Sequence, residues 1–217
     1  MAVSYAIGRG LAVGCFSTFA RWEVRGREGV PPRGRLLVVA NHQSNADPPV
    51  LVAALPRRVW FVAKRELFRY PIASTVLRAW EVHPMDRDGR DSEALRWILQ
   101  GLEQERAMAI FPEGTRSPHS MRKAHHGAAF VALKALAPIL PIGITGTENI
   151  RSFGRIPFPF CRITVNIGQP FSLPSIEGKV DDALLDSMTE MIMMRIAALL
   201  PEEYRGAYRF AASGRAK

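Results

Sequence analysis

The sequence predicts an α/β fold, in which a single domain has a mixed central β-sheet flanked by helices. Short apolar runs, each bounded by turn-forming residues, alternate along the chain with segments whose apolar residues recur at helical spacing. This alternation is typical of a sheet covered by helices. The 217 residues contain no internal repeat and no linker long enough to divide the chain, and 47% of them are hydrophobic, which is enough for one sizeable core.

The first half of the chain is expected to begin with a mostly apolar helix over residues 1–20. Trp22–Arg25 is predicted to form a short strand, and a Pro- and Gly-rich turn over residues 29–34 leads into a buried strand at Leu36–Ala40. Pro48 is placed to begin a short helix that runs to Ala54. Further strands are predicted over residues 58–63 and within residues 80–87, the second being a short strand with its exit.

The second half of the chain is predicted to alternate three helices with three strands. The first of these helices has Asp91 or Ser92 as its N-cap, the second is alanine-rich and is ended by Pro138, and the third is amphipathic. The helices are predicted over residues 92–102, 127–137 and 181–200, and the strands over residues 107–110, 139–147 and 162–167.

The N-terminal helix is expected to lie on a membrane surface and not to cross it. Its uninterrupted apolar stretch, Gly10–Ala20, is too short to span a bilayer, and no cleavage motif of a signal peptide follows a basic start. The arginines that follow the helix favour anionic lipid headgroups. The alternative is an amphipathic helix that packs on the domain. The arginines of this flank are Arg21, Arg25, Arg27, Arg33 and Arg35.

The chain is basic, with 29 Lys and Arg residues against 20 Asp and Glu residues and a formal net charge of +9. Such a surface suits partners that carry phosphate groups, whether nucleic acids, anionic lipids or phosphorylated cofactors. Neither a basic helix with base-reading residues nor an aromatic ribonucleoprotein motif occurs, so a nucleic acid is not expected as a partner. No spacing of cysteines suggests a zinc site.

A histidine and an aspartate follow the predicted buried strand at Leu36–Ala40. They lie in the loop sequence Asn41–Pro48, where His42 and Asp47 are five positions apart. An aspartate that folds back onto the imidazole would fix its tautomer and raise the basicity of the other ring nitrogen. That nitrogen could then remove a proton from a hydroxyl or thiol. The alternative is that both side chains only cap a turn.

A second charged motif, Phe111–Ser117, follows the predicted strand over residues 107–110. Arg116 offers a planar fork that suits the oxygens of a phosphate. Gly114 allows backbone N–H groups to approach an anion closely. The alternative for Glu113 and Arg116 is a surface ion pair of small energetic value.

The order and spacing of these two motifs resemble the lysophospholipid acyltransferase family of the glycerolipid acyltransferase superfamily, over about residues 36–168. The resemblance implies that residues 36–168 are the catalytic core, preceded by a membrane-associating segment over 1–28 and followed by a C-terminal helix and tail over 181–217. It implies transfer of a fatty acyl group from acyl-CoA or acyl-carrier protein to the free hydroxyl of 1-acylglycerol-3-phosphate, giving phosphatidic acid. Glycerol-3-phosphate or another lyso-lipid is the rival acceptor. A thioesterase and a non-catalytic membrane-binding module are alternatives of other classes.

The resemblance also implies roles for particular residues. His42 would deprotonate the acceptor hydroxyl and Asp47 would orient His42. No Gly-x-Ser-x-Gly elbow occurs, which favours direct transfer over a covalent acyl-enzyme. The scheme requires neither a metal nor a cofactor, since the acyl thioester is a co-substrate. The residues implied for the acceptor phosphate are Lys64, Arg87, Glu113, Gly114, Thr115 and Arg116, and those implied for the acyl and acceptor pocket are Pro141 and Ile142.

The sequence departs from the family pattern at one point beside the second motif. The family usually has a pair of lysines where His125 and His126 stand, so phosphate contacts at these positions are in doubt. The expected partners are the lysophospholipid acceptor, the acyl thioester and an anionic membrane surface on the cytoplasmic face of the cell membrane, with acyl carrier protein as the alternative carrier of the acyl group. The Phe-, Pro- and Arg-rich residues 151–160 are expected either to touch the membrane or to pack as a loop.

Overall fold

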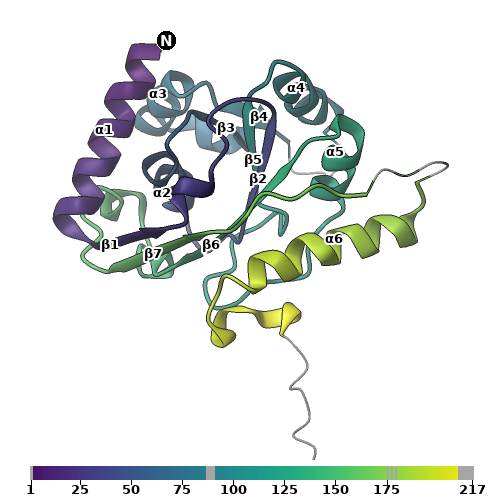
Figure 1. Cartoon of the computed structure of the whole chain (residues 1–217). Helices are drawn as coiled ribbons and strands as arrows, with labels where there is room; N and C mark the ends of the chain where they lie inside the picture. The colour runs from purple at the N-terminus through teal and green to yellow at the C-terminus, as the bar shows by residue number, and fades with distance from the viewer. Residues whose placement is uncertain (1, 87–90, 175, 177, 179, 210–217) are drawn as a thin grey trace, which may run out of the picture.

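A computed structural model describes residues 2–86, 91–174, 176, 178 and 180–209. Within these residues, seven strands form one sheet in the order β1-β7-β6-β2-β5-β3-β4 (Figure 1). The strands are β1 (Arg21–Arg25), β2 (Leu36–Ala40), β3 (Val59–Lys64), β4 (His83–Met85), β5 (Ala107–Ile110), β6 (Ile139–Thr145) and β7 (Arg162–Ile167). The α-helices are α1 (Ala2–Phe19), α2 (Asp47–Ala54), α3 (Pro71–Ala79), α4 (Ser92–Glu103), α5 (Gly127–Ala135) and α6 (Asp182–Ala197).

The sheet is mixed, as predicted. Strand β2 pairs in parallel with both β5 and β6, β3 pairs in parallel with β5 and β4, β7 runs antiparallel to β6, and β1 is parallel to β7. The carboxyl ends of β2, β3, β5 and β6 therefore lie at one edge of the sheet, which we call the catalytic edge. Loops at the carboxyl ends of parallel strands are the usual place for binding and catalytic residues in such sheets.

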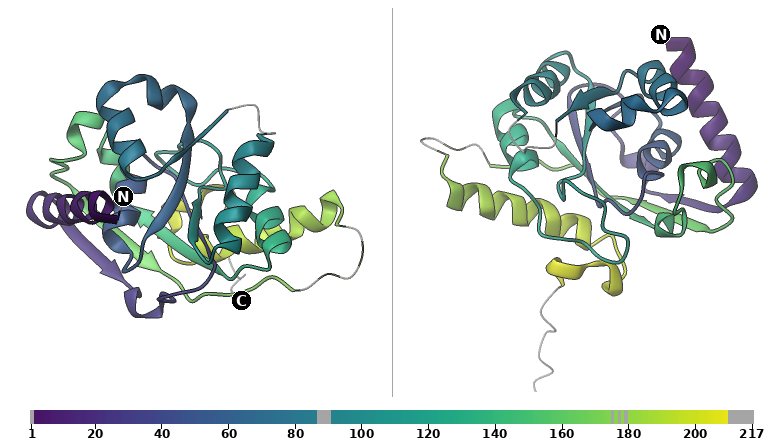
Figure 2. Two further views of the ribbon diagram at one scale, coloured as in Figure 1. Left: turned by 90° about the horizontal axis from the view of Figure 1, so that it is seen from above. Right: turned by 180° about the vertical axis from the view of Figure 1, so that it is seen from behind.

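The central strand β2 explains the layering. Leu36, Val38 and Ala40 point into a core shared with α1 and α2, whereas Leu37 and Val39 point into a core shared with α4, α5 and α6. Helices α1–α3 thus cover one face and α4–α6 the other (Figures 1 and 2). All five residues of β2 are buried, as expected for a parallel strand covered on both faces, where alternation of polar and apolar residues is lost.

The predicted strands and helices are confirmed, with small shifts of their ends. Helix α5 ends at Ala135 and not at Ala137, because Leu136 takes the left-handed conformation with φ 47°. Pro138 disfavours the α conformation for the residue before it. Helix α3 was not predicted; it begins at Pro71, whose fixed φ suits the first turn of a helix.

Helix α1 is packed on the domain. The Tyr5 hydroxyl accepts a hydrogen bond from the Val59 N–H at 3.2 Å, and Phe16 stacks on Trp22 with ring centroids 5.3 Å apart. The other side of the helix exposes an apolar stripe at a spacing of four residues, consisting of Val3 (70% exposed), Ile7 (60%) and Leu11 (65%). Among the described residues, no helix is both long enough and apolar enough to cross a membrane.

Several arginines are used to hold the fold. Arg27 donates to the carbonyls of Ala53 and Ala54 at 2.9 and 2.7 Å, and Arg9 donates to that of Leu55 at 3.3 Å, so both satisfy the C-terminal end of α2. Arg35 donates to the carbonyl of Ala135 at 3.0 Å. The arginine flank predicted to face lipid headgroups is therefore partly committed to the protein's own backbone.

Candidate active site

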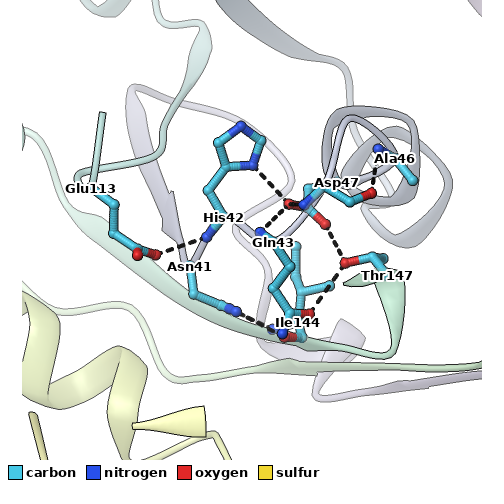
Figure 3. Close-up of polar contacts among 9 residues, drawn as sticks. Asn41, His42, Gln43, Ala46, Asp47, Glu113, Ile144 and Thr147 are labelled. Carbon is cyan, nitrogen blue, oxygen red and sulfur yellow. Dashed lines mark hydrogen bonds and ion pairs between the residues drawn. The ribbon is translucent and has the colours of Figure 1, made fainter. Parts of the chain in front are cut away.

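The loop between β2 and α2 brings His42 and Asp47 into contact. The His42 Nδ1 and Asp47 Oδ2 atoms lie 2.7 Å apart. The Asp47 side chain is completely buried, whereas that of His42 is 17% exposed. Figure 3 shows the imidazole standing above Asp47, with its second nitrogen directed away from the carboxylate. The alternative that both residues only cap a turn does not account for this contact between the two side chains.

Asp47 is surrounded by hydrogen-bond donors. Its Oδ2 accepts the backbone N–H groups of Gln43 at 2.6 Å and Ser44 at 2.8 Å, and its Oδ1 accepts the Thr147 hydroxyl at 2.5 Å. Because a carboxylate held by such donors is an acceptor only, the His42 Nδ1 must carry the proton of their shared hydrogen bond. The His42 Nε2 is then the nitrogen that can accept a proton.

Thr147 fixes the Asp47 carboxylate from a distant part of the chain. It follows β6 and is completely buried. Its hydroxyl has one proton, which it gives to Asp47, so it must accept a hydrogen bond from the Gln43 amide. When the Gln43 amide is oriented with its NH2 group toward Thr147, the nitrogen lies 3.2 Å from Thr147 Oγ1 and 3.1 Å from the Ile144 carbonyl oxygen. Sequence reasoning missed Thr147, and the only signal was its place at the end of a predicted strand.

Asn41 ties the same loop to β6. Its amide donates to the Ile144 carbonyl at 2.8 Å and accepts the Ile144 N–H at 2.7 Å. The side chain thereby imitates a peptide unit and continues the β2–β6 ladder past Ala40, the last residue of β2 (Figure 3). This pair of bonds holds the start of the His42 loop against the strand that delivers Thr147.

Glu113 and Phe111 hold His42 from the β5 side. The two oxygens of Glu113, which is 2% exposed, accept the backbone N–H of His42 at 2.9 Å and that of Arg122 at 2.8 Å. The Phe111 ring stacks on the imidazole with centroids 4.2 Å apart. Burial raises the pKa of Glu113 above its usual value, although the two N–H bonds oppose the shift. These contacts differ from the alternative of a surface ion pair between Glu113 and Arg116, and they favour a positioning role for Glu113.

The segment after α6 clamps the loop that follows the second motif. This C-terminal strap, residues 202–208, exchanges backbone hydrogen bonds with Met121, which donates to Tyr204 at 2.9 Å and accepts from Ala207 at 3.1 Å. The Tyr208 hydroxyl accepts the Ala124 N–H at 2.9 Å. Gly206 has φ 50°, and a Cβ on it would lie 2.1 Å from the Met121 carbonyl oxygen, so only glycine fits there. The sequence pattern gave no sign of this strap.

Four of the other residues implied for the phosphate lie around the same edge. Gly114 (φ 64°) and Arg116 are exposed and Thr115 is half-buried in the loop after β5. Lys64 is the half-buried last residue of β3, the strand next to β5. Arg87 lies outside the described residues. Pro141 and Ile142 are buried within β6, where they pair with Val39 and Ala40, and their place in a substrate pocket remains a prediction.

The two histidines that depart from the family pattern, His125 and His126, make different contacts. The His125 ring lies against Gly114, because a Cβ on that glycine would be 2.9 Å from His125 Cδ2. His126 Nε2 lies 2.8 Å from Asp186 Oδ1 in α6, and this hydrogen bond lowers the pKa of Asp186. No group of three or more His, Cys, Asp or Glu side chains that could hold a metal ion occurs in the described part of the chain.

The fold and the site define an α/β protein in which a buried aspartate orients a histidine at one edge of the sheet. The chain belongs to the acyltransferase family, since the model of that family, described as "Acyltransferase", matches residues 21–145, more than half of the sequence. The family resemblance predicted from the two motifs is thus confirmed.

Individual relatives agree with the family. A Streptococcus pneumoniae protein named 1-acyl-sn-glycerol-3-phosphate acyltransferase is 27% identical over 165 residues, which cover 75% of this chain and 60% of that protein. A Bacillus subtilis protein of the same name is 25% identical over 82% of this chain and 87% of that protein. The crystal structure of the 1-acyl-sn-glycerophosphate (LPA) acyltransferase PlsC from Thermotoga maritima matches with a TM-score of 0.71 and 26% identity, over 90% of this chain and 78% of that one. This chain thus spans about three fifths of the length of the pneumococcal relative.

Proposed function

We propose that the protein transfers a fatty acyl group from a thioester donor to the free hydroxyl of 1-acylglycerol-3-phosphate. The observation that carries the proposal is the His42–Asp47 contact of 2.7 Å, which leaves the second imidazole nitrogen free to act as a base. The names of the bacterial relatives and of the structural neighbour support the choice of reaction and acceptor. The product would be phosphatidic acid, an intermediate of phospholipid biosynthesis.

The chemistry needs one base and one set of anchors. His42 Nε2 removes the proton of the acceptor hydroxyl while the hydroxyl oxygen attacks the carbonyl carbon of the thioester. The tetrahedral intermediate then collapses, the carbon–sulfur bond breaks, and the proton held by His42 passes to the departing sulfur, so a free thiol is released. Asp47 keeps the ring in the productive tautomer and stabilises its protonated form.

The acceptor would be positioned through its phosphate. Arg116 is exposed in the loop after β5, and Lys64 ends the neighbouring strand β3. A guanidinium can bind two phosphate oxygens at once, and an ammonium adds a point charge. Gly114 and Thr115 would offer backbone N–H groups in the same loop, with Arg87 as a further cation. Their part is to hold the hydroxyl near His42, which raises the rate by proximity.

The membrane would supply the lipid acceptor. Three exposed apolar side chains of α1, Val3, Ile7 and Leu11, form a stripe on the side of the helix that faces away from the core. A helix of this kind lies in the interface with its apolar face among the lipid chains. The positive net charge favours the anionic cytoplasmic face of the cell membrane. Acyl-CoA or acyl carrier protein is the donor, and the scheme needs no metal.

The proposed function is tested by thiol release from oleoyl-CoA, measured with and without lysophosphatidic acid for the wild type and for His42→Ala. Release that requires the acceptor and is lost in the variant supports the proposal, and analysis of the lipid product names the acceptor. Release without any acceptor identifies a thioesterase instead. A parallel reaction with an acyl carrier protein thioester covers the second donor class. Absence of release from both donors contradicts the proposal.

A further inference from the structure

The loop between β6 and β7 has an inner and an outer side. Its aliphatic residues point inward, since Ile150 is 3% exposed and Ile156 packs against the core beneath the α1–α3 face. Its aromatic residues point outward, with Phe153 and Phe158 each 48% exposed and Phe160 68% exposed. We call these three side chains the phenylalanine cluster. The chain thus places its largest apolar side chains on the side of the loop that faces water.

The phenylalanine cluster is held in place by specific contacts. The Phe160 N–H donates to the Phe19 carbonyl at 2.9 Å, and the Phe19 ring meets the rings of Phe158 and Phe160 edge to face, with centroids 5.0 and 5.6 Å apart. Arg155 donates to the Pro159 carbonyl at 3.1 Å. Phe160 has φ 44°, a conformation that residues with a side chain rarely adopt. The outward rings are therefore a built feature of the loop, anchored to the end of α1.

The phenylalanine cluster and the proposed active site belong to the same edge of the sheet. The loop leaves β6 at the catalytic edge, and its first helical turn contains Thr147, which bonds Asp47. Figure 1 shows the loop at the foot of α1, at the same end of the sheet where the β2–α2 loop lies. Whatever covers the phenylalanine cluster therefore lies at the same edge of the sheet as His42.

The charges around the cluster select its partner. Arg151 and Arg155 are exposed within the loop, Arg162 is exposed at the start of β7, and no acidic residue occurs from residue 150 to residue 176. Aromatic rings flanked by arginines suit the boundary between the acyl chains and the headgroups of a bilayer that contains anionic lipid. An exposed apolar group of this size without such a partner would cost solubility.

We infer that the phenylalanine cluster inserts into the surface of an anionic bilayer and sets the catalytic edge against the membrane. This contact is separate from the apolar stripe of α1, whose residues lie near the other end of that helix. A role for the phenylalanine cluster in delivering the acceptor to His42 rests on the proposed function. Binding of the cluster to the bilayer does not depend on it.

Vesicle binding tests the insertion. Phe153, Phe158 and Phe160 are changed together to Ser, and binding to phosphatidylcholine vesicles with and without phosphatidylglycerol is measured by flotation. We expect the partition coefficient of the variant on the anionic vesicles to fall by roughly tenfold or more. The loss of about one ring contact with the acyl chains is enough to account for each tenfold step. The wild type should bind the anionic vesicles more tightly than the neutral ones. Equal binding of the variant and the wild type would overturn the inference.

A matched variant controls for loss of surface apolarity. Phe130→Ser, Leu136→Asn and Met191→Ser change three exposed apolar residues on or beside α5 and α6 (38%, 73% and 38% exposed). Asn suits the left-handed conformation of Leu136. This variant should bind vesicles like the wild type. If it loses binding equally, or if the Phe variant instead turns a dimer into a monomer in light scattering, the cluster is not a specific lipid contact and the inference fails.

The activity arm separates the inference from the proposed function. With a water-soluble short-chain lysophosphatidic acid, the Phe variant should keep the wild-type rate, because its base and anchors are unchanged. With the same headgroup embedded in anionic vesicles, its rate should fall in step with binding. If the Phe variant and the wild type transfer acyl groups at equal rates to both substrates, the inference is overturned and the proposed function stands. If the Phe variant loses vesicle binding while the wild type shows no acyl transfer, the inference stands and the proposed function is overturned.

Discussion

The loop that carries His42 and the loop that carries Arg116 leave neighbouring strands of the sheet, but their side chains are held to different degrees. On the base side, Asp47 and Thr147 are completely buried, and both Asp47 oxygens accept hydrogen bonds. On the side proposed to hold the acceptor phosphate, which we call the anion-binding side, Gly114 and Arg116 are exposed and Lys64 is half-buried. A base must have its orientation set before the substrate arrives. A cationic side chain that holds a phosphate can take up its final orientation when the substrate binds.

This comparison predicts that changes on the two sides have different kinetic signatures. Substitutions on the base side should lower kcat, because they disturb a group that acts in the transition state. Substitutions on the anion-binding side should mainly raise the KM of the acceptor. The predictions below run from the largest expected effect to the smallest.

Asp47→Asn should have the largest effect. The amide presents an NH2 group to a site that contains only donors, so the imidazole tautomer is reversed and Nε2 can no longer accept a proton. We expect kcat to fall by about 1,000- to 10,000-fold, measured as acceptor-dependent thiol release. The far-ultraviolet circular dichroism of the variant, compared with the wild type, controls for folding. A variant with more than a tenth of the wild-type kcat would contradict the role of Asp47.

Thr147→Val should lower kcat by roughly 10- to 100-fold, the range found when an outer partner of an active group is removed. Valine has the same shape but cannot donate to Asp47 Oδ1, so the carboxylate loses one of the hydrogen bonds that orient it. Thr147→Ser keeps the hydroxyl and should restore most of the rate. If valine keeps the wild-type kcat while serine lowers it, Thr147 acts only by packing and the buried base network is smaller than described.

Arg116→Ala should raise the KM of the acceptor by about tenfold, the equivalent of roughly 1.4 kcal/mol, with a smaller change in kcat. The wild-type KM should also rise with ionic strength, because salt screens an exposed phosphate contact. Arg96→Ala removes an equally exposed arginine from α4 and should leave KM unchanged. A fall in kcat with constant KM would place Arg116 on the base side of the comparison.

Tyr208→Phe should destabilise the protein by about 1–3 kcal/mol, because the Ala124 N–H loses its acceptor in a buried place. The free energy of unfolding in urea measures the effect. Tyr204→Phe provides the contrast. Its hydroxyl donates to Glu148 at 2.9 Å, and burial together with Glu148 raises the pKa of Tyr204 to about 12. An unchanged stability for both variants would mean that the C-terminal strap does not hold the loop.

Glu113 should give the smallest and most pH-dependent effect. Because burial raises the folded-state pKa of this carboxyl, the stability it contributes is fully present below the ordinary glutamate pKa. That contribution is lost as the pH rises through the raised value. Glu113→Gln lacks this titration, so the wild type should lose stability relative to the variant as the pH rises through that window. Parallel stability curves from acid to neutral pH would show that the pKa is not raised.

The sequence predicted the parts of the site that lie close together in the chain. A strand, a turn and a helix whose first turn contains Pro48 bring His42 and Asp47 together, and local spacing is enough to see this. Thr147 and the strap residue Tyr208 escaped prediction, because they reach the site from other elements and carry no local pattern. The burial of Glu113 was also missed, since burial depends on how three loops pack and not on the motif itself.

The hydrogen bond between Thr147 and Asp47 joins residues that are 100 positions apart, and this separation has a consequence for how the protein is made. Contacts between distant parts of a chain require a large loop to close and therefore form late in folding. During synthesis, the loop with His42 emerges well before the strand that orients its aspartate, and the strap emerges later still. A chain interrupted before residue 147 would contain both His42 and Asp47 and yet lack the Thr147 hydroxyl that fixes the carboxylate. Under the proposed function, acyl transfer would therefore begin only when nearly the whole domain has been synthesised and folded.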